Sequence, residues 1–232
     1  MHDQSEHRKR VRKRFQDEGL DSFDPVHVLE FLLFYSIPRI DTKPIARALL
    51  NHFGSFNAVL EGTKEELMMV PGVGESTAVF IQLLNATGRY YQVNLNSGPQ
   101  ILNTIPECAE YLSRHYCGRR VETVFLLLLD AKKRLLSCQM LSEGEFNFAN
   151  IPTRKVVELV LSTNASAVVI AHNHPGGLAV PSAEDILATR KLSDVLDTLG
   201  VTLADHLVFT DDDWISMFHS RGYRAFDGRR QL

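Results

Sequence analysis

The chain has 232 residues, a formal net charge of -3 and 44% hydrophobic residues. This length allows one large or two modest domains, and the hydrophobic content allows a buried core, so the composition excludes global disorder. The nearly balanced charge excludes a strong electrostatic partner for the molecule as a whole. One local exception is RKRVRKR at residues 8–14, which has six basic residues in seven.

The three cysteines and the apolar runs bear on the compartment. Cys108, Cys117 and Cys138 are odd in number and scattered, so they predict neither a disulfide framework nor a zinc knuckle. The N-terminus is polar and basic, without the apolar stretch of a signal peptide. The longest apolar runs, at 124–129 and 167–171, have the length of strands and not of membrane spans. We therefore expect a reduced, soluble, cytoplasmic protein with no membrane partner.

The first part of the chain, residues 7–93, is predicted to be mostly helical. Asp24 is a plausible N-cap with Pro25 at the first helical position, and Gly54 is a stop for the next helix. Two short helices and the longer segment GESTAVFIQLLNATGRYYQV complete the set. The following NLNSGPQILNTI has the composition of a linker. We place the domain boundary near residue 98, giving a helical domain 1–98 and a second domain 99–232.

The second domain changes character. After the helix PECAEYLSRHYC, the segment ETVFLLLLDAKKRLLSCQML predicts two strands joined by a polar turn. A helix (PTRKVVELVLSTNA), a strand (SAVVIAHNH), a further helix (SAEDILATRKLSDVLDTLGV) and a strand hairpin (TLADHLVFTDDDWISM) follow. Strands alternating with helices indicate that the second domain is an α/β layered domain. With the all-α first domain before it, the chain as a whole is of the α+β class.

The stretch HNHPGGLAVPSAED contains three candidate metal ligands. His172 and His174 end a predicted buried strand, where side chains two residues apart project from the same face. Asp185 falls in the first turn of the next helix, so a short loop can bring the three groups together. Two imidazoles and a carboxylate would leave zinc one open position for water. The alternative is that Ser182 and Asp185 only form a capping box, with both histidines solvated.

The same stretch resembles the zinc-binding motif of JAMM/MPN metalloproteases, His-x-His-x7-Ser-x2-Asp. With AHNHPGG, ADHLVF and GEFN around it, the chain is similar to the RadC (UPF0758) family. The resemblance implies a helical N-terminal region with a helix-hairpin-helix, followed by a JAMM/MPN-like zinc domain. It implies that His172, His174 and Asp185 hold Zn²⁺ and that Ser182 supports an oxyanion. The family's His-Pro-Arg-Glu segment is here PTRK, at residues 152–155.

The JAMM resemblance also implies an upstream glutamate that takes a proton from water. Glu143 is the first choice, because it closes a predicted strand, and Glu145 is the second. Glu158 lies inside the following helix, and each of these is also compatible with a solvated residue. His206 is expected to lie in the core or to support a metal-bound histidine.

The segment VPGVG at residues 70–74 resembles a helix-hairpin-helix turn. Gly72 and Gly74 would allow a tight turn, and the helix that follows would offer backbone N–H groups to a phosphate. Such turns are also common between helices that bind nothing, and Glu75 would repel a phosphate.

Two functions follow from these patterns. The first is a zinc-dependent hydrolase that cleaves peptide or isopeptide bonds in an unidentified peptide or protein substrate. The alternative is a DNA-binding accessory factor in repair or recombination, with weak non-specific binding and with structural or vestigial zinc.

Overall fold

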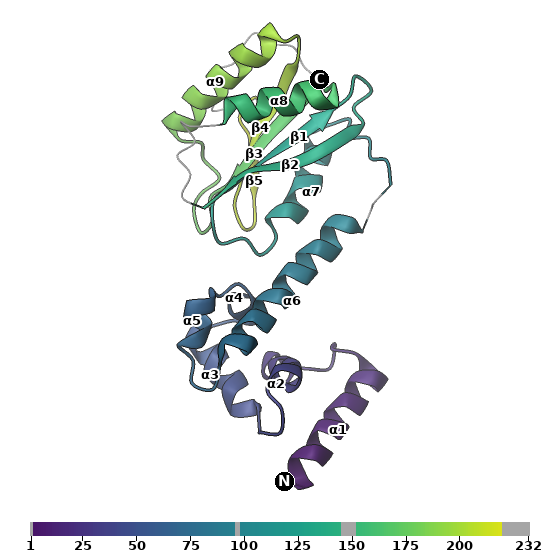
Figure 1. Cartoon of the computed structure of the whole chain (residues 1–232), viewed down its shortest axis with the longest axis vertical. Coiled ribbons are helices and arrows are strands. Elements are labelled where there is room, and N and C mark those ends of the chain that lie inside the picture. The colour runs from purple at the N-terminus through teal and green to yellow at the C-terminus, as the bar shows by residue number, and fades with distance from the viewer. Residues whose placement is uncertain (1, 96–97, 145–151, 220–232) are drawn as a thin grey trace. The chain divides into compact units, whose positions relative to one another are not determined.

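The computed structural model describes residues 2–95, 98–144 and 152–219 (Figure 1). The chain divides into two compact units, Met1–Tyr90 and Tyr91–Leu232. This division lies inside the helix Glu75–Asn94, slightly before the boundary expected near residue 98. No helix within the described ranges is long and apolar enough to cross a membrane.

The first unit is built from helices. Asp24 caps α2 by accepting a hydrogen bond from the backbone N–H of His27, and Gly54 ends α3 with φ +83°, as the sequence predicts. Leu29, Leu49 and Ile81 belong to the core that holds this unit together. Its helices are α1 (His2–Glu18), α2 (Pro25–Ser36), α3 (Lys43–Phe53), α4 (Phe56–Leu60), α5 (Lys64–Met68) and α6 (Glu75–Asn94).

The second unit is a mixed five-stranded sheet with helices on both faces. The strand order is β2-β1-β3-β4-β5, and β3 and β4 are parallel while the other neighbours are antiparallel. The elements are α7 (Ile105–Tyr116), β1 (Thr123–Leu129), β2 (Leu135–Glu143), α8 (Thr153–Thr163), β3 (Ala167–Asn173), α9 (Ala183–Thr198), β4 (Thr202–Phe209) and β5 (Trp214–Ser216).

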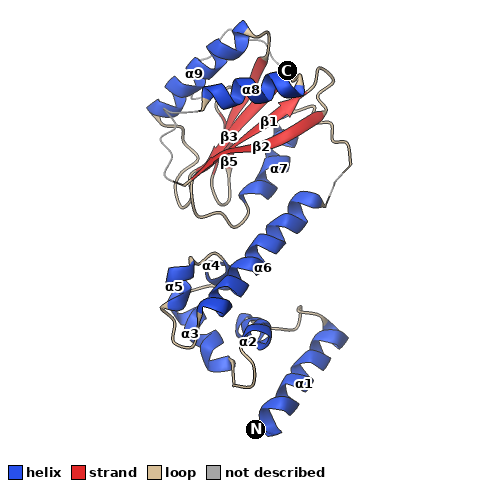
Figure 2. Ribbon diagram, viewed as in Figure 1, coloured by secondary structure: helices blue, strands red, loops and turns tan. Residues whose placement is uncertain are grey.

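Alternating side chains of the central strands form two cores. Leu126 and Ile170 face α8 and α9, whereas Leu127 and Ala171 face α7 (Figure 2). Because strand side chains alternate between faces, the position of each residue along β1 and β3 decides which helices it meets. His172 has the same parity as Ile170, so its ring lies on the face covered by α8 and α9.

Candidate metal site

The two histidines lie where β3 ends. His172 pairs with Val124 of β1, and only 3% of its surface is exposed. The backbone N–H of His174 donates to the Phe209 carbonyl at 2.8 Å, which extends the ladder between β3 and β4 beyond the last strand residue. The side chains therefore keep the alternation of a strand, and the two Nε2 atoms face each other at 2.9 Å.

Asp185 joins the histidines from the start of α9. The Ser182 hydroxyl accepts from the Asp185 backbone N–H at 3.1 Å, and Oδ2 of Asp185 accepts from the Ser182 N–H at 2.7 Å. This is the capping box that the sequence offered as an alternative. The same Oδ2 lies 3.6 Å from His172 Nε2, and one donor atom from each of the three residues lies within 4.8 Å of the others. The cap and the ligand cluster therefore coexist, because the cap aims the carboxylate at the histidines.

The donor atoms of this cluster fit a zinc ion. His174 Nδ1 lies 3.1 Å from the Leu178 carbonyl, which can only accept, so Nδ1 carries a proton and Nε2 is the ring nitrogen turned toward the cluster. Burial opposes ionisation of Asp185, but the neighbouring His172 ring and the hydrogen bonds from Ser182 outweigh it, so the pKa of Asp185 lies well below its ordinary value. Imidazole nitrogens beside an ionised carboxylate are the ligands that zinc takes in proteins with an open site.

A buried histidine stands behind the cluster. His172 Nδ1 lies 2.7 Å from His206 Nε2, as expected for a partner of a metal-binding histidine. His206 belongs to β4, where it pairs with Ile170 of β3. Complete burial, with the neighbouring His172 acting in the same direction, keeps the pKa of His206 far below its usual range, so the His206 ring is neutral. Asp205 turns to the other face of the sheet, where it accepts a hydrogen bond from Ser216 at 2.5 Å.

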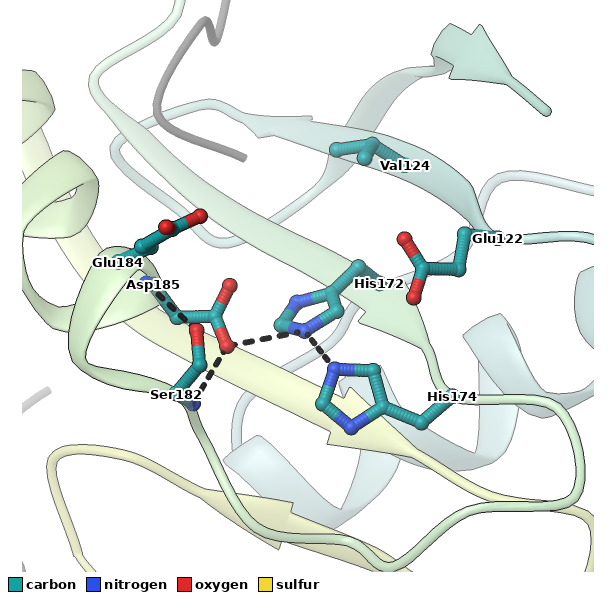
Figure 3. Close-up of a pocket in the computed structure, with 7 residues that line it drawn as sticks. All are labelled: Glu122, Val124, His172, His174, Ser182, Glu184 and Asp185. Carbon is teal, nitrogen blue, oxygen red and sulfur yellow. Dashed lines mark hydrogen bonds and ion pairs between the residues drawn. The ribbon is translucent and has the colours of Figure 1, made fainter. Parts of the chain in front are cut away.

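A pocket opens over the three candidate ligands. Its volume is about 190 Å³, and Figure 3 shows the Glu122 carboxylate, just before the start of β1, turned toward His172. That volume is below the range of roughly 300–1,000 Å³ that encloses whole small-molecule ligands. Its lining consists of Glu122, Val124, His172, His174, Ser182, Glu184 and Asp185.

The backbone around Glu122 is held by the residue between the two histidines. Asn173 is buried; its Oδ1 accepts from the Thr123 N–H at 2.7 Å and its Nδ2 donates to the Val121 carbonyl at 3.2 Å. On the other side, the Gly144 N–H donates to the Glu122 carbonyl at 2.9 Å. Asn173 thus fixes both neighbours of Glu122 and sets where its carboxylate enters the pocket.

Glu143, the sequence's first choice for the catalytic glutamate, is not brought to this pocket. It pairs with Thr123 across β1 and β2, whereas Val124 pairs with His172. Residues that pair across strands share a face and neighbours along a strand do not, so Glu143 projects on the face opposite His172. There it forms an ion pair with Arg119. Glu122 is two residues before Val124 and so shares the face of His172.

The sequence contained one signal for Glu122. The letters ETVFLLLL place this glutamate directly before the strand, at the alternate position that shares a face with Val124. What the sequence could not show was that β1 lies beside β3 in antiparallel order. Only that pairing puts the start of β1 next to the end of β3, where the histidines lie.

The other glutamates and the altered family segment lie elsewhere. Glu145 is outside the described residues. Glu158 is exposed and pairs with Arg154 one turn earlier on α8. Lys155, the last residue of PTRK, donates to the carbonyls of Met140 and Leu141 at 3.0 and 3.3 Å, so this position ties the start of α8 to β2.

The two glycines predicted to bind phosphate differ in their surroundings. Gly72 has φ +90°, and a Cβ there would lie 2.8 Å from Ile45 Cδ1, so the fold itself requires glycine. A Cβ on Gly74 would meet no atom within 4 Å, which leaves room for a ligand to approach. Glu75 begins α6 and pairs with Lys64 at 2.5 Å, so an exposed carboxylate also stands at this helix start.

Comparison with known proteins places the chain in a family. Residues 102–223 match the model of the RadC-like JAB domain, and residues 31–82 match the SAM-like helix-hairpin-helix tandem. The chain is 34% identical to a UPF0758 protein of Ruegeria pomeroyi, over 94% of its own length and 97% of the relative. A UPF0758 protein of Fusobacterium nucleatum is 29% identical, over 92% and 95% of the two chains. With a helix-hairpin-helix region followed by a JAB-type domain that carries a His-His-Asp cluster, this chain belongs to the RadC family.

Proposed function

We propose that the chain is a zinc-dependent hydrolase of peptide or isopeptide bonds, acting in the cytoplasm. The observation that carries the proposal is the Glu122 carboxylate, which lines the same pocket as His172, His174 and Asp185. A metal site that served only to stabilise the fold would need a fourth protein ligand and no neighbouring base. Among the described residues, the cluster contains no fourth histidine, cysteine or carboxylate within ligand distance.

His172, His174 and Asp185 would hold the ion. Zinc in such a site polarises a carbonyl and lowers the pKa of a water to about 7. Glu122 would accept the proton that the attacking water loses and return it to the departing nitrogen. Its place just before β1 suits this transfer, because the side chain is exposed at the pocket and the backbone on both sides of Glu122 is held by Asn173.

Ser182 is the proposed donor to the oxyanion that forms on the scissile carbonyl. Its hydroxyl already accepts from the Asp185 N–H and also interacts with the Asp185 carboxylate. To act on substrate, the O–H must turn toward the pocket, a rotation about one bond that leaves the cap at the helix start in place. A donor of this kind contributes about 10²–10³ in rate where it has been removed from other hydrolases.

The test is a set of three glutamine variants in the zinc-loaded full chain. Glu122→Gln should keep zinc and fold and lower peptide hydrolysis by about 10²–10⁴, because the amide cannot take the proton. Glu143→Gln removes a carboxylate on the opposite face, and Glu184→Gln removes one from the pocket rim, so both should hydrolyse much faster than Glu122→Gln. A mixed library of peptides and lysine-linked isopeptides, read by mass spectrometry, avoids assuming the substrate.

Two outcomes would contradict this assignment. Equal loss of activity in Glu143→Gln and Glu122→Gln would remove Glu122 from its role. A zinc-loaded wild type that cleaves no member of the library would contradict the proposed hydrolysis but not zinc binding.

Weak binding of duplex DNA through its phosphates is the second candidate function. It is supported by the helix-hairpin-helix match and by exposed cations on α1, among them Arg10, Arg12 and Lys13. Arg8 is less available, because its guanidinium donates to the carbonyls of Phe34 and Ile37. Phosphate contacts of this type read no sequence and weaken with salt.

Titration of the full chain with duplex DNA tests this candidate. We expect weak binding that falls steeply between about 50 and 200 mM salt. Replacing Arg10, Arg12 and Lys13 with Gln should weaken it further on any sequence. Absence of binding at the lower salt concentration rejects DNA as a partner.

A further inference from the structure

The geometry points to a relay from Thr189 through His206 to His172 that sets which nitrogen of the His172 ring faces the other two candidate ligands. Thr189 and His206 would thereby be positioning residues that touch neither the metal nor the substrate. The inference deepens the proposed zinc site and rests on His172 being one of its ligands.

Thr189 fixes the direction of the relay. It lies on α9 one turn after Asp185, and its Oγ1 is 2.5 Å from the Asp185 carbonyl oxygen. A carbonyl can only accept, so the hydroxyl must donate its single proton there. The Met217 sulfur, 4.0 Å away, is a much weaker competitor for that proton. Having donated, Oγ1 can only accept from its other neighbour, His206 Nδ1, at 2.7 Å.

The proton on His206 Nδ1 determines the state of its other ring nitrogen. A neutral imidazole carries one proton, so a protonated Nδ1 leaves Nε2 with a lone pair. That Nε2 lies 2.7 Å from His172 Nδ1, which must therefore supply the proton. His172 is left with a lone pair on Nε2, the atom that lies 2.9 Å from His174 Nε2 and 3.6 Å from Asp185 Oδ2.

Because the residues of the relay are buried, water cannot replace their hydrogen-bond partners. Thr189 and His206 have no exposed surface, and His172 has 3%. An unpaired buried donor or acceptor costs about 1–3 kcal/mol, so each group in the relay must find its partner within the protein. The relay also joins the two elements that carry ligands, since Thr189 and Asp185 share α9 while His172 lies on β3.

Removal of the Thr189 hydroxyl should reverse the relay. His206 Nδ1 would lose its acceptor, and the ring would favour a proton on Nε2. That proton would be donated to His172 Nδ1, so the proton of His172 would move to Nε2, among the ligand atoms. Zinc binding would then have to displace this proton and leave the relay unsatisfied.

The experiment uses Thr189→Val, Thr189→Ser and Ser193→Ala in the full chain. Valine keeps the shape of threonine without its hydroxyl, serine restores the hydroxyl, and Ser193 is another buried hydroxyl residue one turn later on α9. The first readout is the ¹⁵N NMR spectrum of the histidine rings in metal-free protein near pH 8, above the ordinary histidine pKa of about 6.5. The second is zinc affinity measured by competition with a chelator.

We expect a proton on His172 Nδ1 in the wild type and a shift toward Nε2 in Thr189→Val. Zinc affinity should fall about 10–100-fold in Thr189→Val, with Thr189→Ser and Ser193→Ala near wild type. A wild-type His172 protonated on Nε2 overturns the inference even if Thr189→Val does not fold. Unchanged zinc affinity in folded Thr189→Val, or an equal loss in Thr189→Ser or Ser193→Ala, also overturns it. The tautomer is read without metal, so a failure of the proposed hydrolysis leaves this test intact.

Discussion

Gly72→Ser tests whether glycine in the turn between α5 and α6 is required by the fold or by a bound ligand. The backbone at Gly72 has φ +90°, which costs a residue with a Cβ about 1–2 kcal/mol. The new Cβ would also lie 2.8 and 2.9 Å from Cδ1 and Cγ1 of Ile45, a buried side chain. Overpacking of this kind typically costs about 1–3 kcal/mol. Together the two effects should destabilise the helical unit by about 2–5 kcal/mol.

The matched control is Gly74→Ser. A Cβ there meets no atom within 4 Å, and serine directly before a helix is a favourable cap, so the change should be neutral within about 0.5 kcal/mol. The chain has a single tryptophan, Trp214, in the second unit, so its fluorescence reports that unit alone while far-UV circular dichroism reports both. Gly72→Ser should lower the dichroism transition of the helical unit by at least about 8 °C and leave the tryptophan transition in place. Equal effects of the two serines, or no effect of either, would refute the reasoning.

Three further predictions concern the second unit. Asn173→Ala should keep zinc but lose most peptide hydrolysis, because the backbone around Glu122 is no longer fixed. Zinc affinity is measured by competition with a chelator, and wild-type hydrolysis by this variant would contradict the prediction. Asp185→Asn should keep the helix cap, since an amide oxygen still accepts from the backbone, while chelator competition shows at least about a 100-fold loss of zinc affinity. A thiol reagent should label exposed Cys117 first, because burial raises the pKa of Cys108 and Cys138 to about 12; labelling of all three at one rate in the folded chain, followed by mass spectrometry, would exclude this arrangement.

Local sequence patterns predicted most of the architecture. The N-cap at Asp24 and the stop at Gly54 depend on residues within one helical turn, and both occur as expected. The strand-length apolar runs and their alternation with helices likewise predicted the layered second unit. The sequence also predicted that His172, His174 and Asp185 lie together, because a strand end, a short loop and a helix start are contiguous in the chain.

The sequence could not indicate which glutamate lies beside the histidines, because that depends on pairing between distant strands. Glu143 ends β2, and nothing local indicates that its side chain projects opposite His172. Glu122 reaches the site only because β1 lies antiparallel to β3, a contact between residues about fifty positions apart in the chain, as the hydrogen bond from Thr123 to Asn173 shows. The contact of the Thr189 hydroxyl with His206 was missed for a similar reason, since it depends on β4 bringing His206 under α9.

Zinc content of the purified full chain, measured by elemental analysis after reconstitution and removal of loosely bound metal, tests the central claim most directly. The structure predicts one zinc per wild-type chain and much less than one in the double variant His172→Ala, His174→Ala, because Asp185 alone cannot hold the ion. Wild-type protein without zinc, or a double variant that retains one zinc per chain, would contradict the site.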